Sequence, residues 1–474
     1  MRQFLTVLLL GLLLFVGYQW WSRQRVEPSP AAIAAGDAKP SSQPAPAAGA
    51  PPIQPPPPDL GQIRMAAPDQ LPAGFAQAAL LNEIRQALEQ GNTAEAQARL
   101  LALPKEALTD PVVKKFTAVL WNNLGVLQAG KGGGAAGVAA LKTAVSLDPA
   151  DPRAHVNLTH AMWESKDPGL NKELLEKTIG LAPDEPLPHL ALAEMLIKSN
   201  DLAGARTHLE QAKDRGAEAP NLRAYQAQLS AQVEQTQKAE QKFLARESSH
   251  FQVKFDGNED DVVWKRVAEI LEDAYREIGQ QLGHYPSQPI LVVLHTRETF
   301  HSATGGPAWS DGLYDPTMGR IKVPTQGALT DQARLTQVLR HEYVHALLHD
   351  RMGGRQVIPQ WFNEGLAMQL AGDPRPDIPE LVHGQVSLYT LTSLEGNWMG
   401  LTPKQANLAY LEGNSATKYF IDRYGMEKVR EVLGQLANGQ PIAAAMQDRL
   451  FITYDQFQQR WLDELNEKIK AGRS

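Results

Sequence analysis

The sequence of 474 residues contains no cysteine. This absence excludes disulfide bonds, thiolate metal sites and a cysteine nucleophile, so any bound metal must be held by histidine, aspartate or glutamate. It also suits an oxidising compartment, where a stray thiol is a hazard. A strongly basic character is missing as well, because 46 Lys and Arg stand against 53 Asp and Glu. Nucleic acid is therefore not an expected partner.

Charged residues are also absent from residues 4–21, a mostly apolar run close to the amino terminus. A helix of that length spans roughly 27 Å, close to the hydrocarbon thickness of a bilayer. Tyr18, Trp20 and Trp21 stand at its far end, as aromatic side chains do at a membrane interface. We therefore expect a single-pass membrane anchor within residues 1–25, with a cleaved signal peptide as the alternative.

Residues 26–71 lack any periodic apolar pattern and are dominated by Pro, Ala, Ser and Gln. This composition predicts a disordered or polyproline-like spacer. Anchor and spacer together favour a bacterial-type inner-membrane protein whose folded domains lie on the periplasmic, extracytoplasmic side. Secretion after cleavage of a signal peptide is the alternative.

Helical repeats are expected over residues 72–246. Two sets of residues recur every 34 positions: Leu124, Leu158 and Leu192, and Pro149 and Pro183. With Trp121 and Gly125 around the first leucine, the pattern resembles the tetratricopeptide repeat (TPR) over about residues 118–220. The resemblance implies a TPR-like solenoid whose curved surface holds a peptide or a partner protein, and a rigid spacer is the alternative. Residues 221–246 are expected to form one long polar helix that leads out of the array.

The apolar pattern changes at about residue 248. Residues 250–255 alternate as in a strand, and residues 289–295 are apolar enough for a buried strand. Shorter strands are expected at 312–315 and 321–323, with a helix at 262–283. Beyond residue 330 the pattern is nearly all helical. Residues 248–474 are therefore predicted to form an α+β domain with a small sheet first and a helical half after it.

A pair of histidines stands in the middle of a helix predicted for residues 331–351. His341 and His345 are four residues apart, so both imidazoles lie on one helix face and can bind one ion. Glu342 is rotated to one side of that face, where it reaches a water on the metal rather than the metal itself. Histidine and carboxylate ligands of this kind favour Zn²⁺.

A catalytic zinc site needs a third protein ligand and one open position. His349 continues the spacing of four, but it lies roughly 12 Å along the helix from His341, too far for bonds of about 2 Å. Leu348 and Arg351 replace the residues of the extended motif that ends in a third histidine. Glu364, separated from His345 by eighteen residues, is the remaining candidate.

At this point the chain resembles the gluzincin metallopeptidases, the thermolysin and aminopeptidase N group with its peptidase MA-like domains. The spacing HExxH-x18-E is matched, and the segment WFNEGLA at 361–367 is similar to the segment around their glutamate ligand. The resemblance covers about residues 248–425. It implies a zinc metallopeptidase in which His341, His345 and Glu364 bind one Zn²⁺ and Glu342 is the general base.

The resemblance also implies that an edge strand around residues 312–323 binds the peptide or protein substrate. A tyrosine or histidine of the helical half stabilises the oxyanion in such enzymes, and Tyr410 is the candidate here, with Tyr419 and Tyr424 as competitors. The motif with which aminopeptidases bind a free amine is missing upstream of His341, so endopeptidase action is expected. The alternative is a non-catalytic, TPR-based binding module with a degenerate peptidase domain.

Overall fold

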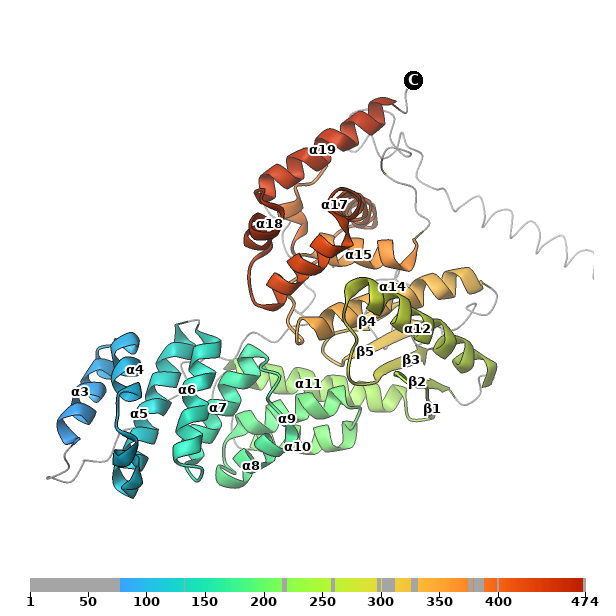
Figure 1. The fold of residues 1–474 in the computed structure, drawn as a ribbon. Helices are drawn as coiled ribbons and strands as arrows, with labels where there is room; N and C mark the ends of the chain where they lie inside the picture. Colours follow the sequence, from blue (N-terminus) through green and yellow to red (C-terminus); the bar gives the residue numbers. More distant parts are fainter. Residues whose placement is uncertain are drawn as a thin grey trace, which may run out of the picture. The chain divides into compact units, whose positions relative to one another are not determined.

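The computed structural model (Figure 1) describes residues 77–471 except residues 132, 215–219, 257–260, 296–299, 301–311, 325–330, 374–377, 379–387 and 399. The predicted anchor and spacer lie outside the described residues. Within the described part, no helix is long and apolar enough to cross a membrane. The chain divides into two compact units, the first ending at Val357 and the second beginning at Ile358.

The first unit begins with consecutive helices that pack against one another (Figure 1). They are α3 (Ala78–Glu89), α4 (Thr93–Leu101), the 3₁₀ helix η2 (Lys105–Thr109), α5 (Pro111–Gly130), α6 (Gly134–Leu147), α7 (Pro152–Ser165), α8 (Lys172–Leu181), α9 (Pro186–Lys198), α10 (Leu202–Asp214) and α11 (Pro220–Ala239). We call α3–α11 the helical array. Asp110 and Asp151 cap α5 and α7, each with a proline in the first turn.

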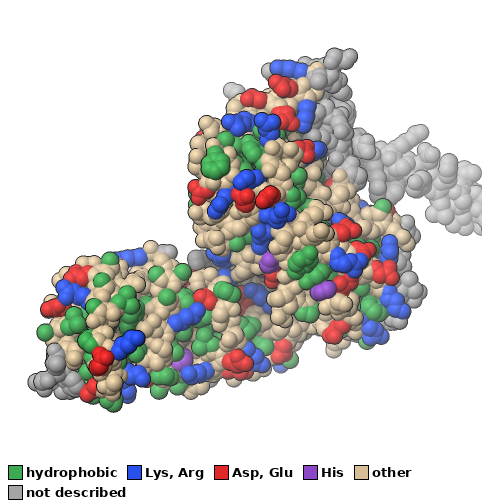
Figure 2. Space-filling view, viewed as in Figure 1, with side chains coloured by type: hydrophobic (Ala, Val, Ile, Leu, Met, Phe, Trp, Pro, Cys, Tyr) green, Lys and Arg blue, Asp and Glu red, His purple; other side chains and the backbone are tan. Residues whose placement is uncertain are grey.

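The 34-residue spacing corresponds to equivalent core positions in the helical array. Leu124 of α5, Leu158 of α7 and Leu192 of α9 are all buried. Polar side chains connect the helices too, since Asn157 donates a 2.8 Å hydrogen bond to Asn122 of α5. The recurring leucines therefore form the apolar core of the array. Figure 2 shows acidic and basic side chains interspersed over its visible face, with no broad area of one sign on the described residues in view.

A five-stranded sheet follows in the same unit, in the order β1-β2-β3-β5-β4. Its strands are β1 (Phe243–Glu247), β2 (Phe251–Asp256), β3 (Ile290–His295), β4 (Leu313–Asp315) and β5 (Arg320–Pro324). β2, β3 and β5 are parallel, while β1 and β4 are antiparallel edge strands. The prediction of one helix over 221–246 is wrong at its end. α11 stops at Ala239, and residues 243–247 pair with β2, because sheet pairing overrides a weak local preference.

One face of the sheet is apolar and is covered by α12 (Asp261–Leu282) and α14 (Gln332–Arg351). Alternate residues of β2, namely Phe251, Val253 and Phe255, are buried on this face. α14 begins at Asp331, whose side chain accepts a hydrogen bond from the backbone N–H of Arg334. The alternating apolar residues of β2 thus form part of the sheet face against which α12 and α14 pack.

The opposite face of the sheet is polar and meets the helical array. Arg320 of β5 is fully buried and donates a 2.9 Å hydrogen bond to Glu240, which follows α11. Lys254 of β2 lies 2.8 Å from the other oxygen of Glu240 and 3.0 Å from Asn200, between α9 and α10. In addition, Met318 of the β4–β5 turn is part of the apolar core of the array. Array and sheet therefore share one buried interface.

The second unit is helical. It contains α15 (Gln360–Ala371), the 3₁₀ helix η3 (Leu391–Leu394), α17 (Pro403–Ala437), α18 (Ile442–Leu450) and α19 (Tyr454–Ala471). α17 starts with a capping box of Thr402 and Gln405 and leaves helical geometry at Gly425, where φ is 82°. The rings of Trp361 and Phe420 lie 6.1 and 5.6 Å from that of Phe457. This aromatic core joins α15, α17 and α19.

The buried ion pairs predict a large loss of stability on substitution of Glu240. Glu240→Ala leaves Arg320 and Lys254 without their carboxylate, and breaking a buried pair costs about 3–5 kcal/mol. Urea unfolding of the purified protein measures the change. Glu176→Ala, which removes an exposed pair with Lys172, is the control and should change stability by about 0.5 kcal/mol or less. Equal effects of the two variants would contradict a stabilising role of the interface.

Candidate metal centre

The two histidines of α14 lie on one side of the helix, one turn apart. Their Nε2 atoms are 3.2 Å apart, and both side chains are half-buried. The apolar residues of the helix, among them Leu339, Val344 and Leu347, are buried. Burial of these residues fixes the rotation of the helix, and the imidazoles of His341 and His345 therefore converge.

Glu364 stands on α15 and is only 6% exposed. One of its oxygens accepts a 2.9 Å hydrogen bond from Gln360, one turn earlier on the same helix. The hydrogen bond from Gln360 thus helps to hold the Glu364 carboxylate in place.

Two glycines explain how α15 is positioned in its own unit. A Cβ atom on Gly365 would collide with the hydroxyl of Thr417 and the carbonyl oxygen of Gly413, both on α17. Conversely, a Cβ atom on Gly413 would lie 2.8 Å from the carbonyl oxygen of Trp361. The two helices cross with no room for a side chain. The glycine next to Glu364 therefore fixes the rotation and the depth of the helix that carries this carboxylate.

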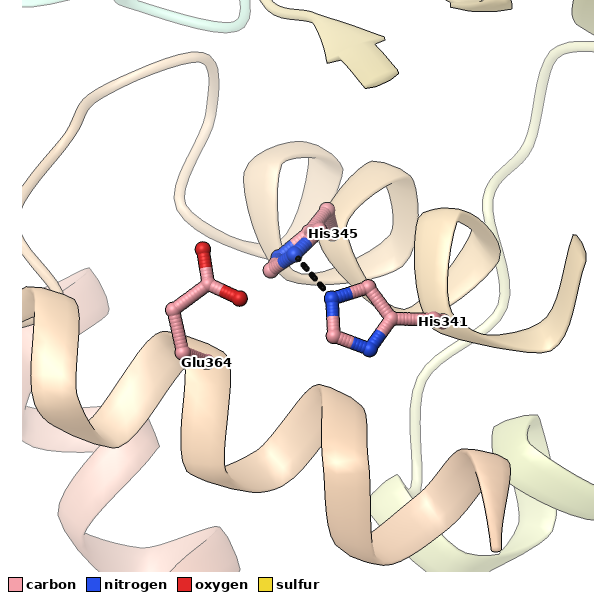
Figure 3. Close-up of side chains that lie close together, drawn as sticks. All are labelled: His341, His345 and Glu364. Carbon is pink, nitrogen blue, oxygen red and sulfur yellow. Dashed lines mark hydrogen bonds between the residues drawn. The ribbon is translucent and has the colours of Figure 1, made fainter. Parts of the chain in front are cut away.

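Figure 3 shows His341, His345 and Glu364 directed toward one another. One ligand atom from each residue lies within 4.8 Å of the other two. Ligands at about 2.0–2.1 Å from a tetrahedral zinc are about 3.3 Å from each other. Two imidazoles and one carboxylate are the donors of a catalytic zinc site with one open position. The donor set and its spacing therefore fit Zn²⁺.

Glu342 is buried, with 7% of its surface exposed. It follows His341 directly and is rotated away from the face that carries the two histidines. It lies close to Gly312, the residue before β4, since a Cβ atom built there would be 3.0 Å from Glu342 Oε1. The carboxylate is thus placed beside the edge strand of the sheet.

His349 lies on the same helix but has a different environment. Its Nδ1 atom is 2.9 Å from the hydroxyl of Tyr314 on β4. Burial, together with the positive charge of Lys198, lowers the pKa of His349 to about 4. The imidazole is therefore neutral at pH 7 and bonded to the sheet. The His–His–Glu group does not include it, in agreement with its distance along the helix.

The three candidate tyrosines for the oxyanion lie on α17. Tyr419 and Tyr424 pack into the aromatic core, with ring centroids 5.5 and 6.3 Å from that of Phe457. Tyr410 is half-buried and lies edge-on against Trp398 at 5.2 Å. Core packing accounts for the first two, and the role of Tyr410 stays a prediction.

The sequence reasoning missed one buried carboxyl group, that of Glu412 on α17. Both of its oxygens accept hydrogen bonds from the backbone N–H of Tyr389, at 3.0 and 3.1 Å. Burial raises the pKa of Glu412 well above its ordinary value. A glutamate directly after the apolar residues 408–411 was the signal that could have revealed it. Its contact is with the backbone before η3, which indicates a role in holding that segment.

A comparison with known protein families finds a match, and it covers the part of the chain that carries His341, His345 and Glu364. Residues 273–466 match the Peptidase MA superfamily, a span that includes α14, α15 and α17. No curated protein matches the chain. The match identifies a peptidase MA domain in this part of the chain, and this superfamily is typically zinc-dependent.

Metal content provides the direct test of the site. His345→Ala and Glu364→Ala should each lose zinc, because either change leaves the ion only two protein ligands. Elemental analysis of the purified, full-length protein measures zinc per chain. His349→Ala is the control on the same helix and should keep its zinc, since its imidazole is bonded to Tyr314. Full zinc occupancy in Glu364→Ala would show that the assignment of the third ligand is wrong.

Proposed function

We propose that this protein is a zinc-dependent peptidase that hydrolyses internal peptide bonds. The observation that carries the proposal is the group of His341, His345 and Glu364 with the carboxylate of Glu342 on the same helix. The peptidase MA match over this region supports it independently. His341, His345 and Glu364 would hold the ion.

The bound ion and the side chains of the protein would have different roles in the reaction. When bound, zinc lowers the pKa of water to about 7 and polarises the scissile carbonyl. Glu342 accepts the proton of the attacking water and passes it to the leaving amine. Tyr410 is proposed to donate a hydrogen bond to the oxyanion.

The sheet offers a place for the substrate. Among the described residues, β4 is an edge strand of the sheet and pairs with β5. An extended peptide can add to such an edge through main-chain hydrogen bonds, which require no particular side chain. Gly312 at the start of β4 lies beside Glu342, so a peptide on this edge would pass close to the base. This placement suits endopeptidase action on peptides or proteins.

The amino-terminal segments suggest where the enzyme acts. We propose that residues 4–21 anchor it in a bacterial-type inner membrane and that the spacer carries the folded domains on the periplasmic side. Reporter enzymes fused after residue 60 test the orientation. We expect a reporter that works only outside the cytoplasm to be active in this fusion. Activity of a reporter that works only in the cytoplasm would reverse the assignment.

A second candidate function rests on the helical array. Arrays of this kind bind peptides and proteins, so the protein would be a binding module that does not turn over what it binds. The array shares buried contacts with the sheet, and binding is therefore measured on residues 72–474 rather than on the array alone. Zinc-loaded protein that binds peptides but cleaves none of a broad library would favour this function.

Catalysis is tested with two isosteric changes. Glu342→Gln should abolish hydrolysis and keep one zinc per chain, because the amide cannot take up the proton but the metal ligands remain. Tyr410→Phe should lower kcat by about 10²–10³ with zinc retained, as expected for loss of one oxyanion donor. Peptide cleavage and zinc content are measured on the same preparations. Cleavage by Glu342→Gln at the native rate would rule out the proposed base.

A further inference from the structure

Strand β4 presents alternate residues to two different neighbours. Asp315 faces the helical array, where it accepts hydrogen bonds from Lys322 and Gln232. Tyr314 faces the opposite way and reaches His349 of α14. Because side chains alternate along an extended chain, Gly312 faces α14 as Tyr314 does. Both residues on this face thus meet the helix that carries the metal ligands.

At Gly312 the backbone comes closer to α14 than any side chain would allow. A Cβ atom added there would lie 2.7 Å from Cγ1 of Val338 and 3.0 Å from Cγ and Oε1 of Glu342. Real Cβ atoms essentially never lie as close as 2.7 Å to another atom, so something would have to move. At 3.0 Å the Glu342 atoms would have to give by a few tenths of an ångström.

The surroundings decide which neighbour moves. Val338 is β-branched, and such side chains have essentially one χ1 rotamer in a helix. The strand is held by its ladder with β5, by the bond between Tyr314 and His349, and by those of Asp315. Glu342 has three rotatable side-chain bonds and is the flexible member of the contact. Turning the Glu342 side chain would relieve only its own contact. The 2.7 Å contact with Val338 would also force the strand and α14 apart, and both changes displace the Glu342 carboxylate.

We propose that Gly312 is a positioning residue: its lack of a side chain gives the Glu342 carboxylate its place between α14 and the edge strand. The inference deepens the proposed peptidase function and rests on it. It also explains why a glycine stands directly before the edge strand.

Gly312→Ala is the first test, with Gly180→Ala as the matched control. Gly180 lies on α8, and an added Cβ atom there would meet nothing within 4 Å. We expect Gly312→Ala to lower kcat by about 10²-fold, the cost of displacing a catalytic group by about 1 Å, with KM changed by less than about threefold. Zinc content should stay at the wild-type level. Gly180→Ala should match the wild type in all three.

A double-mutant cycle in thermal stability gives a readout that needs neither zinc nor turnover. Gly312→Ala should lower Tm in the wild-type background. This loss should be smaller in Glu342→Ala, where the contacted Cγ and Oε1 atoms are gone, but part of it should remain because the closer contact with Val338 is unchanged. Unfolding of the metal-free protein is measured for the four variants. This measurement also applies if Gly312→Ala is too unstable for kinetics.

The outcomes separate this inference from the proposed function. If the wild type cleaves peptides and Gly312→Ala is as active as Gly180→Ala, the positioning role is wrong and the peptidase remains. An equal loss of Tm in both backgrounds would also overturn it, because Glu342 would not be the group that is displaced. If the wild type cleaves nothing, the proposed function fails, and the stability cycle still decides whether Gly312 makes room for Glu342.

Discussion

The buried pairing of Arg320 and Lys254 with Glu240 is the interaction on which the first unit depends. A fully buried guanidinium is tolerated only with an opposite charge and hydrogen bonds around it. Glu240 follows the last helix of the array, whereas both cations come from the sheet. The sheet can therefore keep a polar face because the array covers it, and its apolar face remains available for α14, which carries His341 and His345.

Strand β4 connects these layers to the chemistry of the site. On one side it is bonded through Asp315 to α11, and on the other side Tyr314 holds it against α14. Its remaining edge is the one proposed to bind substrate. The array is thus in contact with the same hairpin that flanks Glu342.

In the second unit, helix packing sets the position of Glu364. Glu364 must sit at a defined depth on α15, and the crossing of Gly365 with Gly413 sets that depth because any side chain would push the helices apart. The aromatic core of Trp361, Phe420 and Phe457 then holds the crossing in place. The glycine after the glutamate in the segment WFNEGLA is therefore a requirement of helix packing, and the tryptophan before it belongs to the core.

Local periodicity in the sequence predicts several features of the structure. A spacing of four places His341 and His345 on one helix face, alternation marks the strand at 250–255, and a 34-residue period marks the leucines of the array. Glu364 was predicted from its spacing and from a family resemblance. Long-range contacts, in contrast, set the strand at 243–247, the pair of Arg320 with Glu240, and the contacts of the edge strand with Glu342 and His349. These contacts join residues far apart in the chain, and no local pattern specifies which distant partner will meet a given side chain.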